Sequence, residues 1–566
     1  MSGGWRINFL LRFFILAGGL VAYRLFYWQI LNSEQLAAAA EKQHWVSFEI
    51  PAKRGEILAA DGFPLATNEE AFLLFASIPD LKEKPQDIAA KIAPFLNNSD
   101  IKETEELIKQ RLKRDDLVWV PIQHRISRQT KEIIQNLKIA GLGFEEEQKR
   151  SYPEGSSAAH LLGFVGFDIN GRDKGYFGLE GFYDLELRGE PGMVRREKDA
   201  SGKPILVGES REEKQKDGRS LQTTIDRSIQ FIVEEKLQKG LKRYGAISGS
   251  VVVMEPSSGA ILAMASLPTY DPANYWKEDK KNFPNPVIAS SYEPGSTFKV
   301  LVMAAALNEG VVVPQTRCDK CDGPRNISGY TIRTWNDKYF PDCTMVEVIQ
   351  HSDNVGMVFV GEKLGREKLV EYLEKFGLGR PTGIDLQEES SPPLRPKGEW
   401  KSIDLATASF GQGIAVTPLQ MVRAVGAIAN QGKLVKPFVV KKIIGEGQTE
   451  EIPLKEGKQI IKAATARVMT EMMVNAVDNG EAKWAKPKGF RIAGKTGTAQ
   501  IPVAGHYDEE KTIASFVGFA PADEPKFIML VTLREPTSSP WGSETAAPLW
   551  FDIAKELFTY YGILPE

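Results

Sequence analysis

The sequence predicts a membrane-anchored, multidomain protein with one N-terminal transmembrane helix, an α+β module and a larger α/β domain, which combines an antiparallel sheet with a helical subdomain. Three observations support this fold class. The 566 residues exceed what one compact core usually holds, the apolar residues are concentrated at the start, and a highly charged stretch divides the remainder. Hydrophobic residues make up 42% and charged residues 26% of the chain, which is typical of folded protein. The net charge of −3 argues against nucleic-acid binding, which usually requires a basic surface.

The first element is an apolar segment from Phe9 to Ile30, FLLRFFILAGGLVAYRLFYWQI. It has about the 20 residues that a bilayer crossing needs. Arg12 and Arg24 lie near its ends, where their long side chains reach the head groups, and the aromatic residues that follow position 22 suit the interface. This pattern favours a membrane span over a buried helix of a soluble protein. No small-x-small cleavage site follows, so an uncleaved signal anchor is favoured over a signal peptide.

The charges around this segment predict its orientation. Arg6 and Arg12 favour a cytoplasmic N-terminus, so residues 1–8 are expected to form a cytoplasmic tail and residues 9–30 the span. Because no second long apolar run follows in the sequence, the rest of the chain is expected on the outer side of the cytoplasmic membrane. Residues 31–50 are expected to continue as a helix.

A smaller α+β module is predicted for residues 31–219. Turn signals between residues 55 and 64 separate short strand-like stretches, and a helical pattern follows at 100–112. The module ends at 209–220, ESREEKQKDGRS, where eight of the twelve residues are charged. This stretch is interpreted as a linker or an exposed hairpin, which sets the boundary near residue 220.

Residues 220–566 are predicted to form one large domain. Apolar runs bounded by turn signals predict strands, and helical periodicity predicts long helices between them. The predicted strands are 250–254, 260–265, 490–501, 514–519 and 527–533, and the predicted helices are 298–307, 366–376, 419–430 and 465–477. This order predicts a sheet with an inserted helical region.

A serine–lysine pair is the first candidate for chemistry. The pattern S-x-x-K occurs at Ser99–Lys102 and at Ser296–Lys299, and context separates the two. Ser99 follows two asparagines, a setting typical of a helix N-cap. Ser296 follows Pro-Gly and opens an apolar helix, so Lys299 lies one turn later on the same face. The helix N-terminus favours a developing anion, and desolvation lowers the pKa of such a lysine, which lets it act as a base.

Two further patterns complete an ordered set. They are Ser352-Asp353-Asn354, an S-x-N, and Lys495-Thr496-Gly497, a K-T-G followed by Thr498. For the first, a capping serine is the alternative interpretation. The second lies in a strand-like segment, where a strand edge offers backbone groups to an extended ligand and glycine permits close approach.

Other catalytic and phosphate-binding patterns are not supported. The sequence contains neither G-x-S-x-G nor H-E-x-x-H, and its five histidines are scattered. The segment from Gly489 to Thr496 fits the P-loop pattern G-x-x-x-x-G-K-T. A P-loop needs a strand before it and a helix after it, whereas charged residues precede this segment and Gly497 and Pro502, which oppose a helix, follow it. The segment is therefore interpreted as a strand.

The set S-x-x-K, S-x-N and K-T-G occurs in penicillin-binding proteins and class A β-lactamases. On these motifs the chain resembles a class B (monofunctional) penicillin-binding protein over nearly its full length. Further similar stretches are RGEILAADGFPLATN (54–68), RSYPEGSSAAHLLGFVG (150–166), GLEGFYDLELRGEPG (178–192), VVVMEPSSGAILAMAS, SFGQGIAVTPLQM and FVGFAPADEPKF. The resemblance implies a non-catalytic pedestal of the dimerisation type at 31–219 and a serine transpeptidase domain of the penicillin-binding/β-lactamase-like fold at 220–566.

Within the family, the chain resembles the division (septal) type more than the elongation type, on GLEGFYDLELRGEPG, TASFGQGIAVTP and WGSETAAPLW. An elongation-type transpeptidase and a non-crosslinking penicillin sensor or scaffold are the alternatives. A class A β-lactamase is disfavoured because it is a small soluble domain with an E-x-x-L-N segment, which is not recognised between Asn354 and Lys495. A bifunctional synthase is disfavoured because the front module shows no glycosyltransferase motif.

The resemblance implies D,D-transpeptidation of peptidoglycan stem peptides through an acyl-enzyme on Ser296. Lys299 would take the hydroxyl proton, and D-alanine would leave with a proton delivered by way of Ser352 and Lys495. The backbone N–H groups of Ser296 and Thr498 would hold the oxyanion.

The resemblance also implies how substrate binds and which partners are present. Asn354 would bind the donor amide, Thr496 and Thr498 the terminal carboxylate, and Gly497 belongs to the same binding strand. β-Lactams would acylate the same serine, and neither a cofactor nor a metal is implied. Expected partners are the cytoplasmic membrane, a polytopic glycan polymerase and division-complex proteins.

Three cysteines, Cys318, Cys321 and Cys343, precede the S-x-N motif and leave several states open. One pair forms a disulfide in an oxidising compartment and leaves an odd thiol, or all three thiols are free. A zinc site is disfavoured because its fourth ligand would have to come from His351 or an aspartate. Packing is the expected role of His351, and Asp353 has no assigned role.

Overall fold

The computed structural model describes residues 4–36, 45–96, 100–114, 116–169, 171–197, 210–503 and 506–565. The chain divides into two units, residues 1–53 with 189–218 and residues 54–188 with 219–566. The hydrophobic core clusters of the described residues all lie in the second unit.

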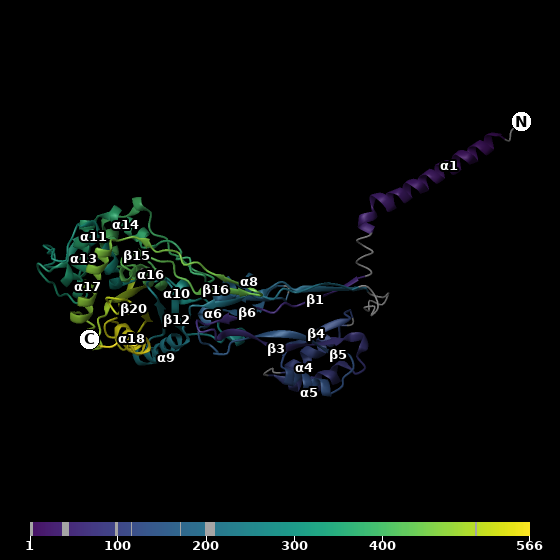
Figure 1. Ribbon diagram of the computed structural model, residues 1–566, viewed down its shortest axis with the longest axis horizontal. Helices are drawn as coiled ribbons and strands as arrows, with labels where there is room; N and C mark the ends of the chain where they lie inside the picture. The colour runs from purple at the N-terminus through teal and green to yellow at the C-terminus, as the bar shows by residue number, and fades with distance from the viewer. Residues whose placement is uncertain are drawn as a thin grey trace. The chain divides into compact units, whose positions relative to one another are not determined.

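The first unit begins with a long apolar helix, drawn in purple in Figure 1. This helix, α1, spans Gly4–Phe26 and continues through a π-helical turn at Tyr27–Leu31. Within the described residues, Gly4–Leu31 is the one helix long and apolar enough to cross a membrane, judged by length and composition. Its large apolar side chains are exposed, and a helix that is apolar on all sides fits a single-pass membrane anchor.

Three antiparallel strands complete the first unit: β1 (Trp45–Ile50), β8 (Gly192–Glu197) and β9 (Ser210–Glu213). The prediction of a continuing helix is wrong for residues 45–50, whose sequence WVSFEI is rich in β-branched and aromatic residues that favour strands. Residues 37–44 of that prediction lie outside the described residues. Of the two interpretations of the charged stretch at 209–220, the structure supports an exposed hairpin over a linker for residues 210–213, because β9 pairs antiparallel with β8. All four residues of β9 are exposed, so its charges stay in water.

The second unit contains a mixed seven-stranded sheet in the order β17-β16-β10-β2-β3-β4, with β5 paired to β3. Its strands are β2 (Ile57–Leu58), β3 (Pro64–Ser77), β4 (Trp119–Ile126), β5 (Leu142–Ser151), β10 (Ser220–Thr223), β16 (Val440–Gly445) and β17 (Gln448–Glu451). Strand β10 pairs in parallel with β2 and antiparallel with β16. The boundary predicted near residue 220 therefore lies within one continuous sheet.

Three helices pack beside β3 around a small separate core. They are α3 (Pro85–Ile92), α4 (Ile101–Leu112) and α5 (Arg128–Asn136). Helix α4 confirms the helix predicted at 100–112, but its N-cap is Asp100, whose side chain accepts the N–H groups of Lys102 and Glu103. Ser99, the predicted N-cap, lies outside the described residues.

A buried ion cluster holds this part of the second unit together. Glu180 is fully buried; its two carboxylate oxygens pair with Arg54 and Arg150, each at 2.6 Å, and Arg54 also pairs with Asp184 at 2.8 Å. Burial would raise the pKa of Glu180, but Arg150 and Arg54 outweigh it and hold the pKa below its usual value. The four residues come from the similar stretches at 54–68, 150–166 and 178–192, so these stretches serve the fold.

The larger domain is built on an antiparallel five-stranded sheet in the order β12-β11-β21-β20-β19. The strands are β11 (Ser248–Met254), β12 (Ile261–Leu267), β19 (Ala493–Val503), β20 (His506–Ala520) and β21 (Phe527–Arg534). Alternate residues of β11 enter different cores, Val251 and Val253 on one face and Val252 and Met254 on the other. This period of two follows from strand geometry. The five strands agree with the five predicted from the sequence.

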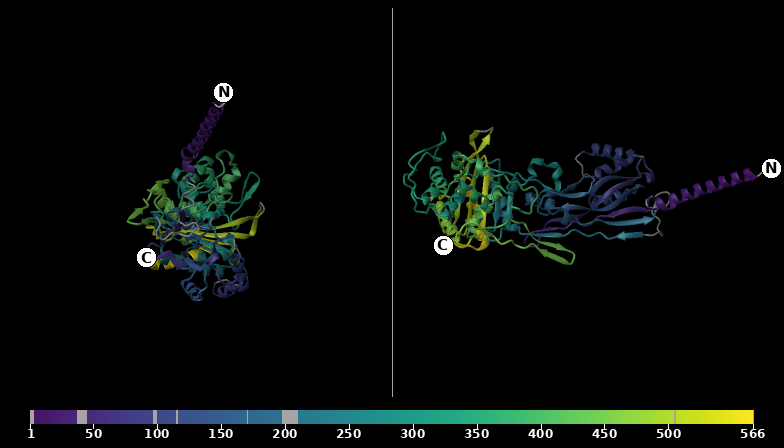
Figure 2. Two further views of the ribbon diagram at one scale, coloured as in Figure 1. Left: turned by 90° about the vertical axis from the view of Figure 1, so that its right-hand side faces the viewer. Right: turned by 90° about the horizontal axis from the view of Figure 1, so that it is seen from above.

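Helices cover both faces of this sheet. Helices α9 (Arg227–Tyr244) and α18 (Ala546–Tyr561) pack on one face, and α16 (Pro418–Ala429) packs on the other; Figure 1 shows them below and above the sheet. The helical region adds α11 (Lys299–Glu309), α13 (Asn354–Leu364), α14 (Arg366–Lys375) and α17 (Ala463–Asn479). Figure 2 shows the yellow strands of the sheet beside these green helices. The predicted α/β domain with an antiparallel sheet and a helical subdomain is confirmed.

Candidate active site

Ser296 lies where a tight turn leads into α11. A 3-10 turn at Gly295–Phe298 joins α11 directly, so Ser296 and Lys299 have the helical spacing that the sequence predicts. Gly295 has a φ of +54°, and a Cβ at this position would lie 2.7 Å from the carbonyl oxygen of Thr498. Glycine is therefore required for the close approach between this turn and strand β19. Ser296 itself is half-buried.

Lys299 is completely buried at the start of α11. Its Nζ donates to the carbonyl oxygen of Ser352 at 2.5 Å, to Ser352 Oγ at 3.2 Å and to Asn354 Oδ1 at 2.8 Å. Among the described residues these are its hydrogen bonds, and none goes to Ser296. Burial, and after it the charge of Lys495, lowers the pKa of Lys299 well below its usual range.

Ser352 lies between two helices, α12 (Met345–Gln350) and α13. Its φ of +55° is uncommon for a residue with a side chain, and it follows from the sharp turn between the helices. Asp353 caps α13, since its Oδ1 accepts the N–H groups of Val355 and Gly356. This cap gives Asp353 a structural role, which no sequence motif assigned to it, and it holds Ser352 and Asn354 on either side of it.

The K-T-G motif lies on β19, an edge strand of the five-stranded sheet. Lys495 is buried, and burial lowers its pKa to about 8; its Nζ donates to Ser352 Oγ at 3.0 Å and to Thr496 Oγ1 at 3.2 Å. A Cβ at Gly497 would lie 2.8 Å from the side chain of Thr297, so glycine lets β19 approach the serine turn. Thr498 Oγ1 accepts the N–H of Gly542 at 2.9 Å, which leaves its hydroxyl hydrogen free to donate.

All eight predicted site residues come together at one cavity of about 620 Å³. Six of them line it: Ser296, Ser352, Asn354, Thr496, Gly497 and Thr498. The two lysines lie behind this wall and reach the cavity through their contacts with Ser352. The arrangement offers a hydroxyl nucleophile, two amines of lowered pKa and a strand edge for an extended ligand.

The cavity also contains residues that no motif indicated. Trp335 and Trp541 lie against each other at its wall, with ring centroids 4.9 Å apart. Glu481 follows the glycine that ends α17 and lines the cavity. Its Oε1 is buried without a hydrogen-bond partner in the described part of the chain, and its charge opposes the lowering of both lysine pKa values. An acid after a helix-ending glycine is too common to have been recognised, whereas Trp541 lies in the similar stretch WGSETAAPLW.

The cysteines lie beside the S-x-N motif. Cys318 and Cys321 form a disulfide, and Cys343 is a buried free thiol, which agrees with the expectation of one pair and an odd thiol. Burial, together with the charge of Asp353, raises the pKa of Cys343 to about 12. His351 stacks on Phe340 with centroids 4.0 Å apart, in agreement with the expected packing role.

Comparison with known proteins agrees with this geometry. The chain matches the penicillin-binding protein transpeptidase domain over residues 249–558 and the penicillin-binding protein dimerisation domain over residues 49–223. It is 35% identical to stage V sporulation protein D of Bacillus subtilis, over 99% of this chain and 86% of that protein. It is 28% identical to the peptidoglycan D,D-transpeptidase FtsI of Escherichia coli, over 99% and 93%.

A solved structure gives the same result for the fold. The crystal structure of penicillin-binding protein 3 from Mycobacterium tuberculosis, complexed with aztreonam, superposes with a TM-score of 0.71 at 26% sequence identity and covers 92% of this chain and 98% of that one. With these matches over the dimerisation module and the transpeptidase domain, the chain belongs to the class B penicillin-binding proteins.

Proposed function

We propose that this protein is a serine-type peptidoglycan D,D-transpeptidase, which crosslinks stem peptides through an acyl-enzyme on Ser296. The observation that carries the proposal is the convergence of two buried lysines on Ser352 Oγ, at a cavity that also contains Ser296. The similarity to the E. coli peptidoglycan D,D-transpeptidase supports the same reaction.

Acylation begins when Ser296 Oγ attacks the carbonyl carbon between two D-alanine residues. Because burial lowers the pKa of Lys299, its amine is available in the neutral form to accept the hydroxyl proton. The neutral amine has two N–H groups, which suffice to donate to the carbonyl oxygen of Ser352 and to Asn354 Oδ1, and its lone pair then remains for the proton.

The tetrahedral intermediate then collapses. The backbone N–H groups of Ser296 and Thr498 stabilise the oxyanion, and loss of one such donor typically costs about 10²–10³ in rate. The C–N bond breaks, and the departing D-alanine takes a proton by way of Ser352, whose Oγ accepts a hydrogen bond from Lys495. The acyl group remains on Ser296.

The second half-reaction forms the crosslink. The amine of a neighbouring stem peptide attacks the ester carbonyl and loses a proton to Lys299. The C–O bond to Ser296 then breaks, a new amide bond remains, and Ser296 regains its proton from Lys299. Covalent catalysis of this kind divides one difficult step into two easier ones.

Substrate recognition follows from the strand edge and its charge. The donor peptide extends along β19, where Thr496, Thr498 and Lys495 bind its terminal carboxylate and Asn354 binds its amide. Thr498 is suited to this role because its Oγ1 accepts the N–H of Gly542, so its hydroxyl hydrogen is available to donate to the carboxylate. β-Lactams, which mimic the D-Ala-D-Ala terminus, acylate the same serine and block the enzyme.

The cellular setting follows from the anchor. Helix α1 is long and apolar enough to cross a membrane, and Arg6 and Arg12 favour a cytoplasmic N-terminus, which supports a transpeptidase domain outside the membrane, where peptidoglycan is assembled. We propose a septal role during division, with a polytopic glycan polymerase and division-complex proteins as partners. The domains proposed for these tasks are a tail at 1–8, a span at 9–30, a pedestal at 31–219 and the transpeptidase domain at 220–566.

A second role is favoured by one comparison. The relative with 35% identity is named as a stage V sporulation protein, so crosslinking of peptidoglycan during sporulation is the second candidate. Depletion separates the roles: filamentous cells indicate division, rounded cells indicate elongation, and a defect confined to spores indicates sporulation.

Crosslinking of lipid-linked glycan polymer in vitro tests the reaction. The full-length chain in detergent is expected to produce crosslinked muropeptides, and Ser296→Ala is expected to produce none. Ser291→Ala, an exposed serine of the same segment, is the matched control and keeps activity. Penicillin labelling without any crosslinked product would support a sensor instead.

A further inference from the structure

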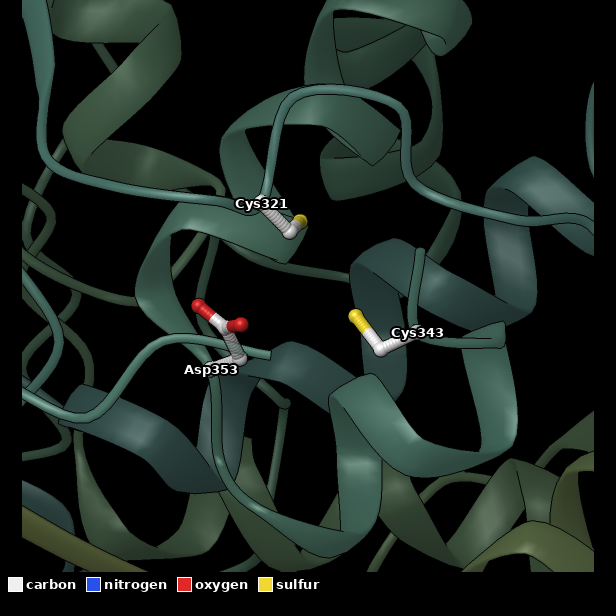
Figure 3. Close-up of side chains that lie close together, drawn as sticks. All are labelled: Cys321, Cys343 and Asp353. Atoms are coloured by element: carbon white, nitrogen blue, oxygen red, sulfur yellow. The ribbon is translucent and has the colours of Figure 1, made fainter. Parts of the chain in front are cut away.

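A buried cluster of sulfur and carboxylate groups lies against the S-x-N motif. Cys321, Cys343 and Asp353 each offer one ligand atom, and these three atoms lie within 4.8 Å of one another. Figure 3 shows the two sulfur atoms and the carboxylate around a common space. The side chains come from the loop after α11, the segment before α12 and the N-cap of α13, and all three are buried.

Cys318 is the candidate fourth ligand. It is fully buried and bonded to Cys321, and its backbone N–H donates to the carbonyl oxygen of Cys343 at 2.9 Å, so the two cysteine-bearing segments are held together. The spacing C-x-x-C is also the one at which two cysteines bind a zinc ion. Opening of the disulfide would leave Cys321, Cys343 and Asp353 around that space, with Cys318, three residues before Cys321, as the candidate fourth ligand.

Within the described residues, one carboxylate oxygen of Asp353 has no hydrogen-bond partner. Oδ1 accepts two backbone N–H groups, whereas Oδ2 is buried and has no hydrogen-bond partner within the described residues. A buried acceptor of this kind is unfavourable unless a donor or a cation compensates it. A cation bound between these side chains would supply the partner that Oδ2 lacks within the described residues.

We propose that Cys318, Cys321, Cys343 and Asp353 form a binding site for a thiophilic divalent cation, with zinc as the best match, in the reduced protein. Three thiolates and one carboxylate give the four-coordinate donor set of structural zinc sites. Calcium and magnesium are excluded by ligand preference, since both require oxygen ligands. The site is separate from the catalytic cavity, because none of its four residues lines that cavity.

Metal binding and the Cys318–Cys321 disulfide exclude each other. A dithiol reductant opens the disulfide by thiol–disulfide exchange: it gives up two electrons and two protons and becomes a disulfide, while Cys318 and Cys321 become thiols. Zinc then displaces one proton from each of the three thiols, and Asp353 binds as the carboxylate. Because Asp353 lies between Ser352 and Asn354, the metal ties the S-x-N motif to the two cysteine-bearing segments.

The test uses the full-length chain in detergent, reduced anaerobically with a water-soluble phosphine that supplies no thiol ligand. The protein is loaded with Zn²⁺ or Co²⁺ and desalted. We expect one equivalent of zinc per chain by elemental analysis, and with Co²⁺ a thiolate-to-cobalt charge-transfer band and the intense visible bands of tetrahedral coordination. Protein with the intact disulfide is expected to bind far less of either ion.

Variants assign the ligands. Cys343→Ser and Asp353→Asn are expected to weaken Zn²⁺ binding by about 10-fold or more, whereas Asp342→Asn, an exposed carboxylate beside Cys343, keeps wild-type affinity. A reduced wild-type chain that binds no more Zn²⁺ than a variant with all three cysteines changed to serine would overturn the site. A Co²⁺ spectrum without thiolate charge transfer, or Zn²⁺ affinity unchanged by Asp353→Asn, would also overturn it. The wild-type cobalt spectrum decides the question even where a variant fails to fold.

Discussion

Lys299 and Lys495 donate hydrogen bonds to the same atom, Ser352 Oγ, at 3.2 and 3.0 Å. Both lysines are buried, and two like charges around one hydroxyl disfavour full protonation of the pair. The pKa of Lys299 is lowered well below its usual range, and that of Lys495 falls to about 8. In the proposed reaction, Lys299 takes the proton of Ser296, and Lys495 supports delivery of a proton to the leaving amine by way of Ser352.

Replacement of Lys299 by arginine tests the general base. A guanidinium stays protonated at any working pH, so the variant cannot accept the proton of Ser296. The second-order rate of acylation by a fluorescent penicillin is expected to fall by about 10²–10⁴. Lys363→Arg, an exposed lysine on α13, is the control and is expected to react at the wild-type rate. A Lys299→Arg variant that is acylated as fast as the wild type would exclude Lys299 as the base.

The pH dependence of acylation tests the two lysines separately. The acylation rate is expected to rise with pH as Lys299 loses its proton, which happens well below the usual pKa of a lysine. It is expected to fall again as pH rises through about 8, because Lys495 then loses the positive charge that binds the carboxylate of the β-lactam. Lys495→Arg keeps that charge and is expected to remove the fall at high pH while it retains the rise at low pH. Rates that continue to rise above pH 8 in the wild type would contradict the role given to Lys495.

The buried charge of Lys495 is expected to lower the free energy of unfolding at neutral pH. Its pKa is lower in the folded state than in the unfolded chain, so the unfolded state binds more protons and the free energy of unfolding rises as pH rises from about 8 toward 10.5. Below pH 8 the cost is fully present. Lys495→Met removes it, and we expect the variant to be more stable at pH 7 by about 1–3 kcal/mol while it loses acylation.

Denaturant unfolding of the full-length chain in detergent measures this change. The exposed Lys488→Met serves as the control and is expected to change stability by less than about 0.5 kcal/mol. A Lys495→Met variant that is less stable than the wild type at pH 7 would show that the hydrogen bonds of Lys495 outweigh its burial cost.

The buried ion cluster of the second unit gives a prediction about stability alone. Glu180→Gln removes the charge that two buried arginines face, and we expect a loss of about 3–5 kcal/mol in the free energy of unfolding. Glu186→Gln removes a half-exposed partner of Arg219 and is expected to cost less than about 1 kcal/mol. Equal effects of the two substitutions would argue against a role for burial at Glu180.

Local sequence patterns were sufficient to predict the secondary structure around the three motifs. Helical spacing from Ser296 to Lys299 and the strand character of the K-T-G segment are both local properties, and the structure has both. The apolar run at 250–254, bounded by a turn signal, likewise predicted a strand, and the structure shows β11 buried on both faces. These features are encoded within a few residues, so one sequence reveals them.

Features that depend on distant segments could not be predicted in this way. Strands β16 and β17 join the sheet of the front module through β10, and nothing local indicates that residues 440–451 pair there. Glu481 reaches the cavity only because α17 ends beside it. The choice of Cys318 and Cys321 as the bonded pair, and the closeness of Asp353 to Cys343, depend on three loops that meet in space.

The central claim is that Ser296 is the acylated nucleophile. The most direct measurement is tandem mass spectrometry of the full-length protein after reaction with a β-lactam and proteolysis. We expect a single adduct with the mass of the opened β-lactam on the peptide that contains Ser296, with fragment ions that locate it on that serine, and no adduct in Ser296→Ala. An adduct on another residue, or one that persists in Ser296→Ala, would contradict the account.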